Sequence, residues 1–122
     1  MTEAMVVVTL GISMIIHVIP VSGVLGGGRL EALYGVRVVD PGVLLAMRHR
    51  AVMFGLLAGL LGLGLFDASL RPVAIATTFT SDLAFLVLAV GVPVDAAMRR
   101  VVVADVVSLG CLAIASVGLA LA

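Results

Sequence analysis

Four long runs of apolar residues, separated by short polar stretches, dominate the chain. They cover residues 5–25, 43–66, 72–93 and 101–121. A helix needs about 20 apolar residues to cross the hydrocarbon core of a bilayer, so each run is long enough to span it. Isolated strands in lipid would leave backbone groups unpaired. The pattern therefore predicts an all-α membrane protein, a four-transmembrane-helix bundle.

Residues that commonly begin helices stand at the starts of the later runs. Asp40 precedes Pro41, Pro72 opens the third run, and Asp95 stands before the fourth. A carboxylate at the N-cap accepts a hydrogen bond from a first-turn amide, and proline suits the first turn because it has no N–H to leave unpaired. These signals predict one membrane domain, residues 1–122, with helices at about 5–25, 43–66, 72–93 and 96–121.

The long connection between the first two helices reads GGGRLEALYGVRVVDPG. Leu30, Leu33 and Tyr34 follow the glycine triplet at positions i, i+3 and i+4, so they share one face of a helix. We expect a short interfacial helix here, with the charged residues of the stretch facing water. Those residues are Arg29, Glu31 and Arg37.

Composition supports a membrane protein and disfavours other classes. Hydrophobic residues make up 63% of the chain and charged residues 11%, with a mean hydropathy of +1.37; soluble domains have roughly 25% charged residues. The formal net charge is zero, so we expect no nucleic-acid partner, because nucleic-acid binding needs a basic surface. The expected partner is the lipid bilayer.

Basic residues are distributed unevenly over the connections. Arg71 alone lies in the second connection, and the other six arginines lie in or beside the first and third: Arg29, Arg37, Arg48, Arg50, Arg99 and Arg100. Cytoplasmic loops of membrane proteins carry the excess of basic residues. We therefore expect the first and third loops in the cytoplasm and both termini outside.

Polar residues recur inside the apolar runs. Thr9, Ser13 and His17 follow one another at a spacing of four in the first helix, and Asp82 and Asp105 lie in the third and fourth. With a rise of 1.5 Å per residue, the charged groups lie ~7 to 16 Å below the cytoplasmic edge. This predicts an intramembrane polar cluster in the inner half of the bundle: His17, Arg48, His49, Arg50, Asp82 and Asp105.

Helix direction predicts how these residues pair. Side chains lean toward the N-terminus of their helix, so His17 and Asp82 should meet near mid-membrane. Arg48 or Arg50 should pair with Asp105, where a charge-assisted hydrogen bond offsets desolvation. The two arginines lie about 200° apart on the helical wheel. Arg48 suits a bond between helices, and Arg50 suits a pocket or a lipid phosphate.

Simpler interpretations stay open for these residues. Arg48 and Arg50 also fit as interfacial anchors that set topology. Asp82 fits either a functional, protonatable role or a neutral acid hydrogen-bonded to Thr78 or to a neighbouring helix. His17 also fits as a packing residue whose ring is hydrogen-bonded within the bundle.

A seam of small residues on the second helix predicts close helix packing. The seam contains one GxxxG pattern, and small residues let another backbone approach closely, within one chain or between copies. Its glycines are Gly55, Gly59 and Gly62. A homo-oligomer is one arrangement that this packing would support.

The stretches RLEALYGV, MRHRAVMFGLL and RRVVVADVVSLGCL resemble a family of small bacterial four-helix membrane proteins with DoxX-like topology. The resemblance covers most of the chain and implies the fold and a location in the bacterial cytoplasmic membrane. It implies no catalytic residues. Some members carry the automatic name phosphopantetheine adenylyltransferase, a chemistry of soluble doubly wound domains with a paired-histidine motif; here His17 and His49 stand alone.

Three functional hypotheses follow. The first is a non-enzymatic bundle that binds a small amphiphile or a proton, or serves as an accessory subunit of a larger membrane complex. The second is an electron-transfer module that binds haem or quinone, with His17 and His49 as haem ligands. The third is proton-coupled transport of a small solute by a homo-oligomer, through His17, Asp82 and Asp105. No metal cluster and no pair of nucleophile and base stands at a diagnostic spacing, so an enzyme is not favoured.

Overall fold

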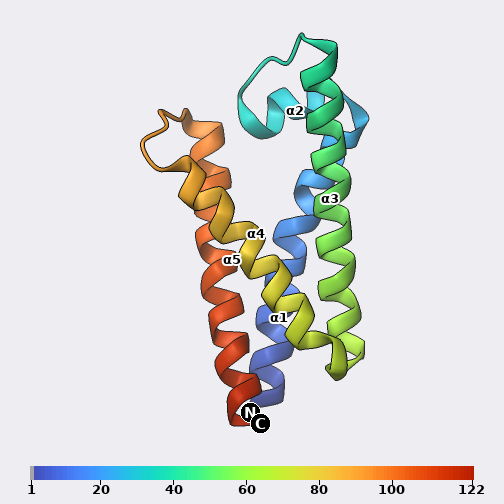
Figure 1. Cartoon of the computed structure of the whole chain (residues 1–122), viewed down its shortest axis with the longest axis vertical. Helices are drawn as coiled ribbons and strands as arrows, with labels where there is room; N and C mark the ends of the chain where they lie inside the picture. The colour runs from blue at the N-terminus through green and yellow to red at the C-terminus, as the bar shows by residue number, and fades with distance from the viewer. Residues whose placement is uncertain (1) are drawn as a thin grey trace.

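The computed structural model describes residues 2–122, and this part of the chain is helical throughout apart from short connections (Figure 1). Four helical segments are long and apolar enough to cross a membrane, which confirms the all-α four-helix bundle and indicates a multi-pass membrane protein. In chain order the elements are α1 (Thr2–Val18), the 3₁₀ helix η1 (Ile19–Leu25), α2 (Gly27–Tyr34), α3 (Pro41–Phe66), the 3₁₀ helix η2 (Ala68–Leu70), α4 (Arg71–Ala89) and α5 (Ala96–Leu121).

The four long helices form a four-sided bundle. α1 packs against α3 and α5, and α4 packs against α5 and α3. Both termini lie together at one end, whereas α2 and the connection 90–95 lie at the other (Figure 1). We call the part of the bundle around the termini and η2 the terminal half, and the part around α2 and residues 90–95 the loop half.

The predicted helix starts are confirmed. The Oδ1 atom of Asp40 accepts a hydrogen bond of 2.9 Å from the amide of Val43, and that of Asp95 accepts one of 2.8 Å from the amide of Met98. Pro72 lies in the first turn of α4. The predicted end at residue 93 was wrong: α4 ends at Ala89, since Gly91 at φ +76° turns the chain in a conformation that favours glycine.

The first span changes geometry at Ile19, where η1 continues α1 in the tighter 3₁₀ form. Pro20 accounts for the change, because it has no N–H to donate to the preceding turn. Near the end of η1, the Nε atom of Arg48 donates a hydrogen bond of 2.9 Å to the carbonyl of Val24. Arg48 thus bonds to another element, as predicted, and satisfies a carbonyl that the helix end leaves free.

The predicted interfacial helix is α2. Leu30 and Tyr34 are buried beneath it, Leu33 is partly buried, and Arg29 and Glu31 are exposed. The spacing i, i+3, i+4 therefore placed the apolar face correctly. Tyr34 brings an aromatic ring from this helix over the loop half of the bundle.

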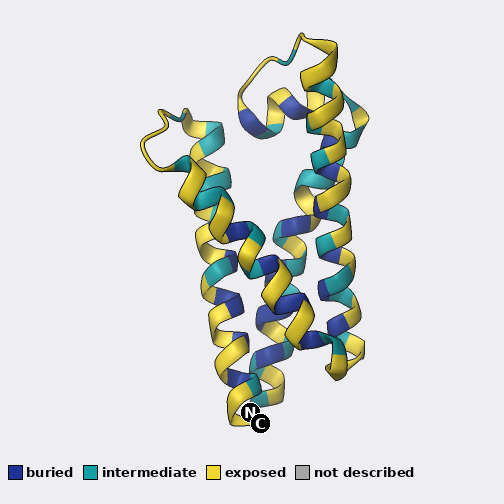
Figure 2. Ribbon diagram, in the orientation of Figure 1, coloured by how far each residue is buried: buried dark blue, intermediate teal, exposed yellow. Residues whose placement is uncertain are grey.

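Buried residues line the inward faces of the long helices, and apolar residues cover much of the outside (Figure 2). The main hydrophobic core lies in the terminal half and consists of Val6, Leu10, Leu61, Ala74, Ile75, Leu112 and Ala115. At Gly118 an added Cβ would lie 2.6 Å from Val6 Cγ2, so only glycine allows α5 to approach α1 this closely.

The predicted glycine seam of α3 is only partly in contact with a neighbour. Gly55 faces Val21 of η1, and Gly62 faces Met14 of α1, but Gly59 is surrounded by open space. The buried face of α3 instead passes through a row beside the seam: Ala51, Phe54, Ala58, Leu61 and Gly64. Phe54 and Leu61 are the two large side chains of that row, and small residues separate them.

Candidate functional site

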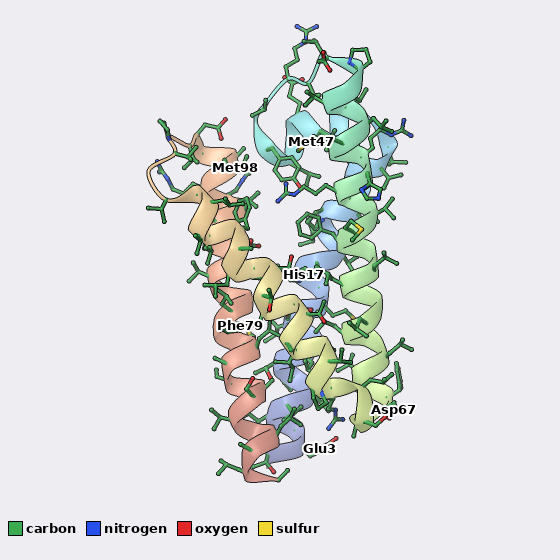
Figure 3. All side chains as sticks on the ribbon, viewed as in Figure 1. Glu3, His17, Met47, Asp67, Phe79 and Met98 are labelled. Carbon is green, nitrogen blue, oxygen red and sulfur yellow. The ribbon has the colours of Figure 1, made fainter. Side chains whose placement is uncertain are left out.

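His17 and Asp82 form a buried pair midway along the bundle, where Figure 3 labels His17. The Nε2 atom of His17 lies 2.9 Å from Oδ1 of Asp82, and each side chain is 1% exposed. The Nδ1 atom of His17 lies 2.8 Å from the carbonyl oxygen of Ser13. The pairing predicted from helix direction is therefore present, and it joins α1 to α4.

The hydrogen bonds of His17 determine the charge of the pair. A carbonyl oxygen only accepts, so Nδ1 must carry the proton that it donates to Ser13. The contact between Nε2 and Asp82 Oδ1 then holds one proton, either on the ring or on the carboxyl group. Imidazolium with carboxylate and imidazole with carboxylic acid have the same net charge, so the pair is neutral overall.

Two buried oxygens beside this pair have no hydrogen-bond partner within residues 2–122. They are Oδ2 of Asp82 and Oγ1 of Thr78, one helical turn earlier on α4. Asp82 is therefore not bonded to Thr78, and its hydrogen bond goes to His17 of a neighbouring helix, the other partner that the simpler interpretation allowed. Buried polar oxygens are nearly always paired with protein or water, so these two atoms are exceptions at the centre of the polar cluster.

Arg50 lies among three aromatic rings in the loop half. The Cζ atom of its guanidinium is 5.2 Å from the ring centre of Tyr34, 4.9 Å from that of Phe54 and 5.3 Å from that of Phe85. These distances are typical of cation–π contacts. Within residues 2–122 no carboxylate oxygen lies within 4.0 Å of Arg50. The guanidinium is held by rings, and its N–H donors have no ionic partner.

Asp105 of α5 is buried, with 6% of its surface exposed. The predicted ion pair with Arg48 or Arg50 was wrong: Arg48 points to the carbonyl of Val24, and the rings hold Arg50. In the described chain the carboxylate of Asp105 has no ion-pair partner. An unpaired guanidinium and an unpaired carboxylate thus remain in the same half of the bundle.

Both groups line one partly open cavity of about 250 Å³, which we call the Arg50 cavity. Asp82 and Ser81 also line it, and its other walls are mainly apolar. A second cavity of about 380 Å³, the His17 cavity, shares Phe54 and Asp105 with the first.

A third cavity of about 700 Å³, the loop cavity, shares Arg50 and Phe85 with the Arg50 cavity. Met47 of α3 and Met98 of α5 line it, and Figure 3 shows them on its two sides. Most of its remaining lining is apolar. The Arg50 cavity, with its charged residues, therefore adjoins the larger and mainly apolar loop cavity toward the loop end.

The structure brings four members of the predicted cluster together: His17, Arg50, Asp82 and Asp105. Arg48 and His49 are exposed on the outside of α3 and lie apart from these four. The geometry also does not fit a haem held between His17 and His49, because both ring nitrogens of His17 are engaged in hydrogen bonds. Within residues 2–122 no group of three or more potential ligands is placed to hold a metal ion.

Sequence reasoning missed the aromatic rings around Arg50. Phe54 follows Arg50 by four residues and Phe85 follows Asp82 by three, so helical spacing could have placed these two rings beside the polar residues. It also missed the hydrogen bond of 2.7 Å between the hydroxyl groups of Ser13 and Ser108. That bond joins α1 to α5 one turn from His17.

A second arginine was predicted only as a topology signal. Arg71, 5% exposed, donates from its two terminal nitrogens to the two carboxylate oxygens of Glu3, each at 2.8 Å. Its Nε atom donates to the carbonyl of Gly64 at 2.8 Å. Glu3 lies at the terminal end in Figure 3, so Arg71 ties the start of α1 to the turn between α3 and α4.

No protein-family model, curated protein or solved structure matches the chain. The function must therefore be inferred from the geometry of the cavities and of the charged residues that line them.

Proposed function

We propose that the protein is a non-enzymatic membrane bundle that binds one amphiphile, with the polar head in the Arg50 cavity and the apolar part against the exposed apolar residues that border this cavity, Met53 and Leu88. The observation that carries this proposal is the presence of an unpaired guanidinium and an unpaired buried carboxylate in a single cavity with mainly apolar walls. Ligand sites typically combine an apolar lining with a few convergent polar groups.

The donors of Arg50 give the site its polar anchor. Three rings hold the guanidinium without using its N–H groups in an ion pair, so these groups stay available to an acceptor on a ligand. A charge-assisted hydrogen bond made away from bulk water is among the stronger contacts a protein can offer. The exposed apolar residues Met53 and Leu88 at the edge of the Arg50 cavity can then contact the apolar part of an amphiphile.

The same proposal includes the location of the protein. We place it in the bacterial cytoplasmic membrane, as a member of the DoxX-like group that it resembles, with the loop half on the cytoplasmic side. Six arginines lie in or beside the first and third connections. The single arginine of the terminal half is paired with Glu3, so little basic charge remains there to oppose this orientation.

Native mass spectrometry of protein extracted gently from its own membrane tests the binding role. We expect the wild type to retain an added mass that Arg50→Leu loses. Arg29→Leu, which removes an exposed arginine of the same half outside the three cavities, should retain it. Equal retention by all three proteins, or by none, would overturn the proposal. A foreign protein subunit in place of a ligand would instead indicate an accessory role.

Proton-coupled transport is a second candidate, favoured by the single proton that His17 and Asp82 share next to the unpaired Asp105. Four helices form a thin wall around a path, so this function requires a homo-oligomer. Proteoliposomes that contain a pH-sensitive dye would test it. Solute-dependent proton uptake that disappears in Asp82→Asn would favour transport, and proton uptake that is unchanged in the variant would exclude this route.

A further inference from the structure

We infer that the bound amphiphile carries a zwitterionic head with an ammonium group that retains N–H donors beside an anionic oxygen group, as in phosphoethanolamine. This inference rests on the proposed function and specifies the chemistry of the same site. It follows from three properties of the Arg50 cavity: its net charge, the hydrogen-bonding capacity of its polar residues, and its size and apolar border.

The charges that line the Arg50 cavity balance. Arg50 contributes one positive charge, Asp105 contributes one negative charge, and the proton shared by His17 and Asp82 makes that pair neutral. A head with a net charge would leave one charge uncompensated away from water, which is costly. A zwitterion adds equal and opposite charges and preserves the balance.

The hydrogen-bonding groups require opposite partners at the two ends of the head. The guanidinium of Arg50 only donates, so it needs an anionic oxygen. The carboxylate of Asp105 accepts and has no ion-pair partner in the described chain. An ammonium with N–H groups can donate to it, whereas a trimethylated ammonium has no N–H to donate.

The size and the border of the Arg50 cavity fit a small head joined to an apolar chain. The cavity of about 250 Å³ suits a head of a few non-hydrogen atoms. Met53 and Leu88 border it and are exposed apolar residues of membrane-spanning segments, so an acyl chain can continue from the head into the lipid. A membrane aminophospholipid and a free zwitterion share the head chemistry, and only the lipid has an apolar chain to contact these two residues.

The test is native mass spectrometry of the full chain, reconstituted with phosphatidylethanolamine, phosphatidylcholine or phosphatidylglycerol of identical acyl chains. We expect phosphatidylethanolamine to be retained about tenfold more than either of the others, the factor that one charge-assisted hydrogen bond provides. Asp105→Asn should reduce this preference. Glu31→Gln, which alters an exposed acid of α2 outside the cavities, should not.

Competition with free phosphoethanolamine distinguishes the two sources of the head. If the free zwitterion is the ligand, it displaces the lipid at equal concentration; if the lipid is the ligand, it does not. Arg50-dependent binding of all three lipids without preference, or a preference for phosphatidylglycerol or phosphatidylcholine, would overturn this inference and leave the proposed function intact. Lipid binding independent of Arg50 would overturn the proposed function itself. The comparison of lipids on the wild type needs no variant to fold.

Discussion

Arg71 and Arg50 both lie in membrane-spanning segments, yet their surroundings differ completely. Arg71 in the terminal half donates to both oxygens of Glu3 and to the carbonyl of Gly64. Arg50 in the loop half rests on three aromatic rings and has no ionic partner in the described chain. The first arrangement uses an arginine to hold helices together, and the second leaves its donors free.

The two halves of the bundle differ in the same way. The hydrophobic core and the closest contact between helices, at Gly118, belong to the terminal half. The loop half contains the three adjoining cavities, each of which has charged residues in its lining. The terminal half has a cavity of about 480 Å³ between α4 and α5, and within residues 2–122 no charged residue lines it. This separation indicates that the terminal half maintains the fold while the loop half is open to a ligand, and the following experiments test that division.

The largest expected effect comes from His17→Ala, at the boundary between the halves. It leaves Asp82 buried without its partner, and breaking a buried pair costs about 3 to 5 kcal/mol. Reversible unfolding in detergent micelles measures the loss. Asp82→Asn is the matched control, because the side-chain amide of asparagine can still donate a hydrogen bond to Nε2 of His17. If Asp82→Asn destabilised the protein as much as His17→Ala does, the result would contradict a neutral pair.

Arg71→Ala should destabilise the terminal half by about 1 to 3 kcal/mol, because it leaves the carbonyl of Gly64 without its donor and releases Glu3. The same unfolding measurement applies. Retention of the added mass in native mass spectrometry should be unchanged at a temperature where the variant is folded. Loss of the ligand from a folded variant would show that the two halves are not separable.

Arg50→Leu should have the opposite effects to Arg71→Ala: it should abolish ligand binding and change the free energy of unfolding only slightly. Its three ring contacts contribute about 0.5 to 1 kcal/mol at a partly exposed site, so the stability of the ligand-free protein should change by no more than that. Ligand binding should be lost. A stability loss as large as that of Arg71→Ala would assign Arg50 a structural role instead.

The hydrogen bond between Ser13 and Ser108 should contribute less. Interhelical hydrogen bonds in membrane proteins average about 0.6 kcal/mol in double-mutant cycles. We expect a coupling energy of this size from the Ser13→Ala, Ser108→Ala cycle. A coupling above about 2 kcal/mol would indicate that the bond belongs to a cooperative network with His17.

The smallest effect concerns the titration of Tyr34. Burial raises the pKa of its phenol above the ordinary value, and the nearby Arg50 partly opposes the increase. The folded state therefore holds the proton more tightly than the unfolded state, so this contribution to stability is present at neutral pH and is lost as the pH rises through the pKa of the folded state. Tyr34 is the only tyrosine and the chain has no tryptophan, so ultraviolet absorbance reports it directly. Arg50→Leu should raise the pKa further, and an unchanged titration would contradict the contact.

The features that depend on local chemistry were predictable from the sequence. Asp40 and Asp95 cap their helices, because a cap depends on amides only three residues away. The pair of His17 and Asp82 also followed from the sequence, since the length and direction of each helix set the depth of these residues. Both kinds of prediction need only the position of a residue along its own helix.

The partners of the arginines were not predictable in this way. Asp105 was the predicted partner of either arginine. Arg48 instead donates to the carbonyl of Val24, and Arg50 instead contacts aromatic rings from three helices. Those contacts depend on how the helices rotate about their axes and on where α2 folds back. The cavities depend on the same rotations, so the pattern of the sequence located the polar cluster but did not reveal the empty space beside it.

The 3₁₀ geometry of η1 also sets the reach of the first span. Seven residues in a 3₁₀ helix extend about 14 Å, compared with about 10 Å in an α-helix, so α1 and η1 together span about 39 Å with 24 residues. That is the length of the 26-residue helices α3 and α5. The tighter winding thus lets a shorter segment match the length of the longer helices, and it brings the chain to the level at which α2 lines two of the cavities.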